Sequence, residues 1–408
     1  MDTLQYRQDS VLRHPGYLNF AASRVLSSLA FQSIAVAMGW MIYDQTSSAF
    51  ALGLVGLFQF LPMVILTFVV GQVADRFDRR RIGLICQLAE GITSLLLALA
   101  ASAHMLSARG ILVAVAVLGA AQAFERPTMA ALLPTVVPES LLQKAIATTT
   151  SMMQTALVVG PSLGGLLYGL DELAPFLVSF VFFLIASVNV ISIRMERPAP
   201  VRQPVTFASV FAGVAFIRGK PVILGTISLD LFAVLLGGAT ALLPMFARDI
   251  LHAGPWGLGL LRAAPAIGAV AMSVYLARHP LRAGAGRKMF WAVAIFGLAT
   301  IVFAISENIA LSIAALLIAG ASDTISVVVR SSLVQMLTPD EMRGRVNAVN
   351  SLFIGTSNQL GEFESGMVAA LLGPVLTGVL GGVGTIAVVL LWLRLFPDLV
   401  RVETLKGD

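Results

Sequence analysis

Acidic residues interrupt several long apolar runs of this 408-residue chain, and carboxyl groups in such surroundings are suited to binding and releasing protons. In a closed, water-poor cavity a carboxyl group favours its neutral form, whereas water or a nearby arginine favours the ionised form. A change in its surroundings can therefore make the group take up or release a proton. The predicted proton-coupling residues are Asp230, Asp323, Glu362 and Glu364, with Asp230 and Glu362 preferred.

Charges of both signs lie in the same apolar runs and are candidates for the wall of a substrate cavity. They are Arg24, Glu125, Arg126 and Arg330. A charge at the centre of a membrane helix is unfavourable by about 2.5–3.5 kcal/mol, so it normally faces water, a partner or both. Asp323 and Arg330 are spaced so that they share one helix face, about 10 Å apart along the axis. Each of these charges could instead belong to a buried structural ion pair.

The elements that must position these charges are membrane helices. Hydrophobic residues make up 57% of the chain and charged residues 12%, whereas a soluble domain is about one quarter charged. Each apolar run is close to the roughly 20 residues that a helix needs to cross a bilayer. The runs lie near 18–43, 50–70, 82–103, 110–133, 143–169, 174–193, 222–247, 257–277, 289–306, 309–336, 346–372 and 374–397. The predicted fold is an all-α, polytopic membrane protein with twelve transmembrane helices in two six-helix bundles.

The basic residues predict the orientation in the membrane. Lysine and arginine are retained on the cytoplasmic side, and most of the 27 fall in cytoplasmic segments if the N-terminus is inside. Both termini are therefore predicted to be cytoplasmic. Because the pI near 9.7 follows from this bias, the expected partner is the lipid bilayer and not nucleic acid. The four histidines have no ligand spacing, so neither a metal site nor a cofactor is expected.

A proline- and arginine-containing segment divides the chain into two halves. The predicted division is an N-terminal bundle over 1–194, a cytoplasmic linker over 195–220 and a C-terminal bundle over 221–408. Within the linker, apolar residues recur at helical spacing from Phe207 to Ile217, which predicts a short helix on the inner membrane face; a plain connector is the alternative. An offset of 201 residues aligns Gly160 with Gly361, so the fifth and eleventh spans are equivalent in an internal repeat.

The segment Gly71–Arg81, of sequence GQVADRFDRRR, is a short basic loop between two apolar runs. It resembles the signature loop after the second helix of the major facilitator superfamily. The matching residues are Gly71, Ala74, Asp75, Arg76, Arg79, Arg80 and Arg81, while Asp78 stands where the family pattern has glycine. The resemblance implies a latch between the two halves that favours the outward-open state. Its expected members are Gly71, Asp75, Arg76, Arg79 and Arg80, with Arg343 and Arg345 at the start of the eleventh span.

A second motif lies inside the fifth span. Gly160, Pro161, Gly164 and Gly165 resemble the G-P-x-x-G-G motif of export-type antiporters in this superfamily. Proline frees a backbone carbonyl one turn earlier and can bend the helix, while glycines let a neighbouring helix approach closely. The resemblance implies export. Ordinary packing of small residues, without any bearing on direction, is the alternative.

Further stretches, including Arg24–Ser27 and Thr338–Val346, look like the bacterial enterobactin-exporter and macrolide-efflux branch of the superfamily. The resemblance implies a monomeric secondary transporter in the bacterial inner membrane. Its expected activity is export of a small organic molecule, such as a siderophore, a macrolide or another drug-like compound, by alternating access and in exchange for protons. Residues on the first, fourth, seventh and tenth spans are expected to line its cavity.

Other functions are compatible with the same sequence to different degrees. An importer or uniporter of the same fold is the nearest alternative. A membrane scaffold or receptor has no reason to bear the cost of charges on several spans. An enzyme is not expected, because no cluster of a nucleophile and a base is recognisable. The chain has no phosphate-binding loop of the G-x-x-x-x-G-K-S/T kind, so an ion gradient is the expected energy source.

Overall fold

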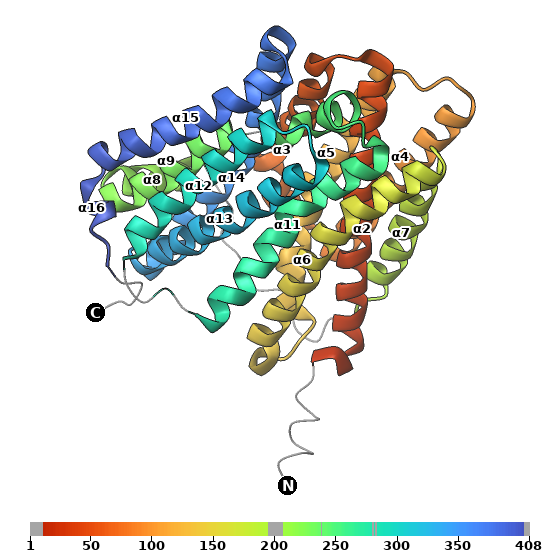
Figure 1. The fold of residues 1–408 in the computed structure, drawn as a ribbon. Helices are drawn as coiled ribbons and strands as arrows, with labels where there is room; N and C mark the ends of the chain where they lie inside the picture. Colours follow the sequence, from red (N-terminus) through yellow and green to blue (C-terminus); the bar gives the residue numbers. More distant parts are fainter. Residues whose placement is uncertain (1–10, 195–206, 238, 280, 282–283, 404–408) are drawn as a thin grey trace. The chain divides into compact units, whose positions relative to one another are not determined.

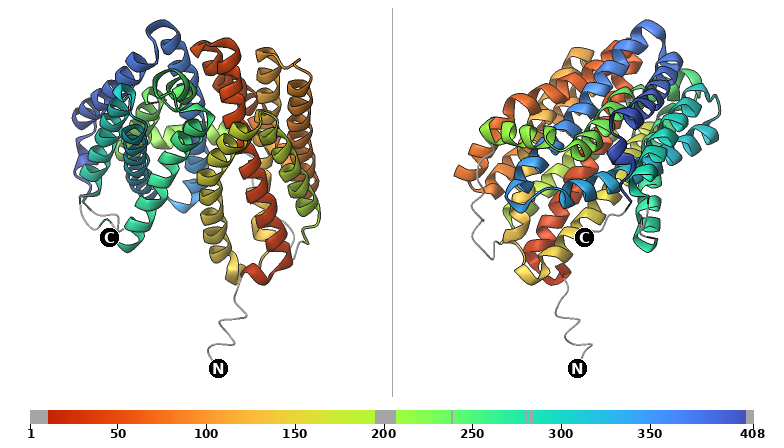
Figure 2. Two further views of the ribbon diagram at one scale, coloured as in Figure 1. Left: turned by 45° about the vertical axis from the view of Figure 1, so that its right-hand side comes forward. Right: turned by 90° about the vertical axis from the view of Figure 1, so that its left-hand side faces the viewer.

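A computed structural model of the chain describes residues 11–194, 207–237, 239–279, 281 and 284–403 (Figure 1). For a few helical residues within these ranges only the backbone is described: 67, 68, 71, 72, 74, 75, 207–210, 239, 340, 341, 348, 351 and 352. The regular elements of the described residues are all helical, as the two views of Figure 2 also show. The predicted all-α fold class is confirmed.

Long helices account for most of these residues. The α-helices are α2 (Pro15–Thr46), α3 (Ala49–Arg76), α4 (Arg79–Ser102), α5 (Ala108–Leu132), α6 (Glu139–Leu170), α7 (Ala174–Ile191), α8 (Phe207–Arg218), α9 (Pro221–Leu236), α10 (Leu243–Met245), α11 (Gly254–Arg278), α12 (Ala285–Ile305), α13 (Ile309–Met336), α14 (Asp340–Leu372), α15 (Pro374–Leu395) and α16 (Pro397–Val400). Shorter elements are η1 (Val11–Arg13), η2 (Leu133–Thr135), η3 (Ala239–Leu242) and η4 (Phe246–Ile250), of which η4 is a π-helix.

Eleven stretches of described helical residues are long and apolar enough to cross a membrane. Helix α14, which covers the predicted eleventh span, is 33 residues long but is not among them. It carries the charged residues Asp340, Glu341, Arg343, Arg345, Glu362 and Glu364. The chain is therefore a multi-span membrane protein, and the total of twelve spans stays a prediction.

The helices form two compact units. The N-terminal unit comprises Met1–Met41 and Leu61–Pro204, and the C-terminal unit comprises Ile42–Phe60 and Val205–Asp408. The predicted division at 194 and 220 stays a prediction, and residues 195–206 of the expected linker lie outside the described ones. The predicted short helix is present as α8, which packs on α9 and α14. It is thus a helix of the C-terminal unit and not a plain connector.

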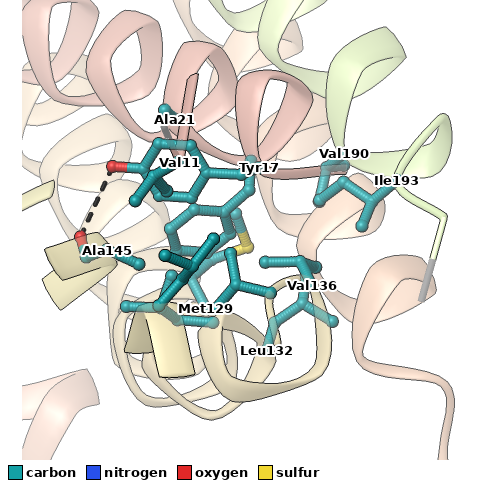
Figure 3. Packing of buried hydrophobic residues seen from close by; sticks show 13 residues of the cluster. Val11, Tyr17, Ala21, Met129, Leu132, Val136, Ala145, Val190 and Ile193 are labelled. Atoms are coloured by element: carbon teal, nitrogen blue, oxygen red, sulfur yellow. Dashed lines mark hydrogen bonds between the residues drawn. The ribbon is translucent and has the colours of Figure 1, made fainter. Parts of the chain in front are cut away.

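Aromatic and aliphatic side chains join helices α2, α5, α6 and α7 of the N-terminal unit (Figure 3). Tyr17 from α2, Met129 from α5 and Val136 beyond η2 are buried in one cluster. The Tyr17 hydroxyl donates a hydrogen bond to the Ala145 carbonyl of α6 at 3.4 Å and lies 3.1 Å from the Thr149 hydroxyl. A buried phenol needs such partners, so this cluster sets where α2 and α6 meet.

The glycines of the fifth-span motif lie where α6 crosses α2, two helices that run alongside each other in Figure 2. A methyl group added to Gly164 would lie 2.5 Å from the Ser33 carbonyl oxygen, and one added to Gly160 would lie 2.6 Å from Gln32 Cβ. The predicted close approach of a neighbouring helix is therefore present. Gly361 of α14 packs in the same way on Leu235 of α9, as the predicted repeat requires.

We expect Gly164→Ala to destabilise the protein by about 1–3 kcal/mol, because the added methyl group would push α6 away from α2. Gly110→Ala is the matched control, since a methyl group there would meet its nearest neighbours at 3.6 Å. Thermal unfolding in detergent, followed by a dye that reacts with the buried thiol of Cys86, measures both variants. Equal midpoints for Gly164→Ala and the wild type would show that the two helices are not in close contact.

The seventh predicted span, near 222–247, lies within the membrane-length stretch Pro221–Ile250, whose helix is interrupted. Helix α9 ends at Leu236, and η3, α10 and η4 follow it as separate short elements. Two consecutive glycines at 237 and 238 stand at the break, and glycine is unfavourable in a helix interior by about 1 kcal/mol. A side chain at 237 would also collide with Phe296, because its Cβ would lie 2.6 Å from Cε1 of that ring.

Residues Ile42–Phe60, from the last part of α2 to the middle of α3, belong to the C-terminal unit, and specific contacts connect them to it. At the end of α2, the Tyr43 hydroxyl donates a hydrogen bond to Asp249 of η4, and Arg248 donates to the Tyr43 carbonyl at 3.2 Å. Along α3, Gly53 lies directly against Gly366 of α14. These contacts position the first half of α3 beside the acidic part of α14.

Candidate functional site

A cavity of about 200 Å³ lies inside the C-terminal unit, and it includes two of the predicted proton-coupling residues. Asp323 reaches it from α13 and Glu362 from α14. The remaining wall is mostly apolar and consists of Val234, Gly237, Thr240, Pro265, Phe296, Thr300, Phe303, Leu316, Ala319, Gly320 and Asn358. The break after α9 contributes directly to this wall, because Gly237 and Thr240 flank it.

The size of the cavity limits what it can hold. Sites for drug-sized ligands are about 300–1,000 Å³, whereas a water molecule occupies about 30 Å³ in the liquid. The cavity therefore has room for on the order of six waters. Two carboxyl groups beside a few waters in an apolar wall can exchange protons, and the space is too small for a whole siderophore or macrolide.

The other two predicted carboxyl groups are placed differently. Asp230 of α9 does not line the larger cavity, but it borders a small adjacent void of about 10 Å³ together with Asp323. Glu364 is partly exposed, and the Ser365 hydroxyl lies 3.5 Å from one of its oxygens. The structure thus brings Asp230, Asp323 and Glu362 to one region of the unit and leaves Glu364 away from the larger cavity.

Asp230 is paired with Arg330 of α13, one of the predicted substrate-cavity residues. The two side chains are 6% and 5% exposed, so the pair is buried. The guanidinium Nε of Arg330 has no hydrogen-bond partner among the described residues. Because the carboxylate of a close ion pair is stabilised in its ionised form, this contact favours a charged Asp230. Asp230 and Arg330 thus form the buried ion pair that the sequence analysis gave as the alternative to a place in a cavity wall.

Arg262 of α11 is a further charged residue of this unit that the sequence analysis did not select. It lies within electrostatic range of Glu362, and its buried Nε has no partner among the described residues. Gly56 of α3 also lies close to Glu362, since an added Cβ there would lie 3.2 Å from Glu362 Oε2. Arg262 could have been selected from the sequence, because it lies within an apolar run, as Arg24, Arg126 and Arg330 do.

The remaining predicted substrate-cavity residues lie in the N-terminal unit. Glu125 of α5 is fully buried and accepts a hydrogen bond from the Ser27 hydroxyl at 2.9 Å. Arg126 is exposed and donates through Nε to the Gln122 side chain at 2.9 Å. Arg24 lies within electrostatic range of Glu90, a buried acid of α4.

The signature segment Gly71–Arg81 is mostly helical, and the prediction of a loop over its whole length is wrong. Helix α3 continues to Arg76 and α4 begins at Arg79, so only Phe77 and Asp78 lie between them. This turn can be short because Asp78 starts α4 directly. Its carboxylate caps the helix by accepting a hydrogen bond from the Arg80 amide at 2.9 Å. Its backbone is extended, with φ −60° and ψ 118°, so the position has no need of glycine.

Two arginines of this segment connect the turn to other helices of the N-terminal unit. Arg79 is nearly buried and donates to the Ala131 carbonyl of α5 at 3.3 Å, while Arg80 donates to the Ile193 carbonyl after α7 at 3.0 Å. The side-chain hydrogen bonds from Arg80 lower the pKa of the Asp78 carboxyl below its ordinary value. The cap therefore stays ionised at neutral pH and is lost only as the pH falls through that lowered pKa.

The other expected latch residues are described less completely. Arg76 is exposed at the end of α3, and Arg343 and Arg345 are exposed in the first turns of α14. For Gly71 and Asp75 the structure describes only the backbone, which is part of α3. The described contacts of Arg79 and Arg80 support a role in shaping the turn, and the latch stays a prediction.

Comparison with known proteins relates the chain to transporters. The model of the Major Facilitator Superfamily matches residues 20–362. Enterobactin exporter EntS of Citrobacter koseri is 26% identical, over 95% of this chain and 93% of that protein. Macrolide efflux protein A of Streptococcus pyogenes is 25% identical, over 57% of this chain and 59% of that protein.

Solved structures agree on the fold. The nucleoside transporter NupG superposes with a TM-score of 0.75 at 12% identity, covering 93% of this chain and 100% of that chain. A bacterial homologue of the human lysosomal transporter Spinster superposes with a TM-score of 0.74 at 14% identity, covering 96% and 97%. At these identities the likeness concerns the fold alone. By its matching family model, its membrane-length helices and its fold, the chain belongs to the Major Facilitator Superfamily.

Proposed function

We propose that the protein is a secondary active transporter of the bacterial inner membrane that exports a small organic molecule by alternating access in exchange for protons. The observation that carries the proposal is the pair of carboxyl groups, Asp323 and Glu362, that line a small cavity inside a bundle of membrane helices. Carboxyl groups within membrane-spanning helices are costly to insert into a bilayer, and a purely structural protein has no reason to bear that cost. A cavity with room for only a few waters suits proton exchange, so the organic substrate binds elsewhere in the protein.

The relatives and the fifth-span motif support the proposed direction and substrate class. One relative is an enterobactin exporter and another a macrolide efflux protein, so a siderophore, a macrolide or a similar drug-like compound is the proposed cargo. Gly160, Pro161, Gly164 and Gly165 support export through their resemblance to the antiporter motif. In this proposal Arg24 and Arg126 contact substrate, the buried Glu125 lies behind them, and both termini are cytoplasmic.

The proposed latch uses the signature segment. Asp75, Arg76 and the first turns of α14, with Arg343 and Arg345, would hold one of the two transport states. The helix N-terminus at the start of α14 carries a partial positive charge that favours a nearby carboxylate. The protein is proposed to transport its substrate as a monomer. The two bundles that move during transport are proposed to be separated at residues 194 and 220.

Everted membrane vesicles test the proposed function. With enterobactin and a macrolide antibiotic as probes, we expect accumulation of at least one probe when the vesicle lumen is acidic, and loss of that accumulation when a protonophore is added. Asp75→Asn is the control, expected to insert normally and to abolish flux. Accumulation only with the opposite gradient would favour an importer, and equilibration without any dependence on the gradient would favour a uniporter.

A further inference from the structure

The N-terminal unit contains its own pair of buried acids. Glu90 of α4 and Glu125 of α5 are both 0% exposed. One nitrogen joins them, because Gln122 Nε2 donates to Glu90 Oε1 at 2.6 Å and to Glu125 Oε2 at 3.0 Å. Two neighbouring carboxyl groups in a buried site strongly resist being ionised together, so the pair favours a state that holds one proton.

Hydrogen-bond donors are distributed unequally between the two acids. Glu125 accepts from the Ser27 hydroxyl at 2.9 and 3.1 Å and from Gln87 Nε2 at 2.9 Å, in addition to Gln122. Glu90 has only the Gln122 donor, and its Oε2 is buried without a partner among the described residues. Several donors stabilise a carboxylate, whereas a buried oxygen without a donor makes the ionised form costly. The shared proton therefore belongs on Glu90.

Arg126 determines which end of the Gln122 amide faces the acids. Its Nε donates to Gln122 Oε1 at 2.9 Å, so the amide nitrogen must point to Glu90 and Glu125. Gln87 also presents its nitrogen to Glu125. Calcium and magnesium require several oxygen ligands, whereas this site surrounds its acids with donors. The ligand that fits is a proton.

Few charged or titratable groups of the described residues surround Glu90. Glu125 and Arg126 face it from α5, Arg24 lies within range on α2, and Cys86 lies one turn earlier on α4. Helix α7, which packs along α4, has no charged residue between Ala174 and Ile191. Burial, Glu125 and, to a smaller extent, the two arginines thus act together on the proton affinity of Glu90.

We propose that Glu90 and Glu125 form a second proton-binding site, which holds one proton on Glu90. The use of this site in transport rests on the proposed function, whereas the binding of the proton does not. Gln122 acts as a positioning residue that bridges the two acids, and Arg126 orients Gln122. Sequence analysis did not select Gln87 and Gln122, because neutral amides in apolar runs carry no charge signal.

Infrared spectroscopy of the purified full-length protein in lipid nanodiscs tests the proposal. At neutral pH, Glu90→Gln is expected to reduce the absorption of protonated carboxyl groups by the equivalent of one group. Glutamine has the shape of a neutral glutamate, so the variant should fold. Glu172→Gln, at an exposed acid after α6, is the matched control and should leave the absorption unchanged. An unchanged spectrum of Glu90→Gln would overturn the assignment.

Chemical labelling of the wild-type protein gives a second measurement that does not depend on a variant. A carbodiimide adds to protonated carboxyl groups, so peptide mass spectrometry should find the label on Glu90 and not on Glu125. Label on Glu125 instead would overturn the proposal. If Glu90 is labelled but the vesicles show no proton-driven export, the site stands and the proposed function fails. If export occurs and the spectrum of Glu90→Gln is unchanged, the function stands and this site does not.

Discussion

Arg330→Met is expected to destabilise the C-terminal unit by about 3–5 kcal/mol, because it leaves the carboxylate of Asp230 buried without its partner. The double variant Asp230→Asn, Arg330→Met removes both charges and should recover most of that loss, since a buried ion pair is often no more stable than neutral side chains of similar size. Tryptophan fluorescence during thermal unfolding is a suitable probe, because Trp392 lies in the same buried cluster as Val329.

Arg394→Met is the control for this prediction, because Arg394 is an exposed arginine on α15 of the same unit. It should unfold at the wild-type temperature. In the unstable single variant, proton-driven accumulation and substrate exchange should fall together, as expected when folding is impaired. A stable Arg330→Met protein that has lost only proton-driven accumulation would instead make the pair part of the coupling mechanism.

Glu362→Gln and Asp323→Asn are each expected to reduce proton-driven accumulation at least tenfold while substrate exchange at equilibrium continues. Each variant removes a titratable group from the cavity, whereas exchange requires only the conformational change with substrate bound. A tenfold effect corresponds to about 1.4 kcal/mol. Paired measurements in vesicles, with a pH gradient and with substrate on both sides at equal pH, separate the two activities.

Glu364→Gln is the matched control, because Glu364 lies on the same helix as Glu362 but does not line the cavity. It should retain both accumulation and exchange. Normal accumulation in both cavity variants would exclude the cavity as the coupling site and would leave Asp230 and the acids of the N-terminal unit as candidates. Loss of exchange together with accumulation would indicate damage to the fold.

The amino-acid sequence by itself determined the helical fold and the residues worth testing. Long apolar runs predict membrane helices because each run must satisfy its backbone hydrogen bonds internally, and this is a local property of the chain. A charge in such a run is costly wherever its partner lies, so Asp230, Asp323, Arg330 and Glu362 could be selected without knowing the fold. The glycines at 160 and 164 likewise predicted a close helix contact from residue size alone.

Only the tertiary structure decided how these residues are combined. Asp230 and Arg330 are 100 positions apart, and no local pattern indicates that they pair. Nor does any local pattern indicate that Asp323 lines a cavity with Glu362. The break after Leu236 and the capping role of Asp78 depend on contacts that hydropathy does not contain. The network of Glu90, Gln122 and Glu125 joins two helices through a neutral amide. Hydropathy and spacing describe one helix at a time, whereas a hydrogen bond or an ion pair depends on which faces of different helices pack together.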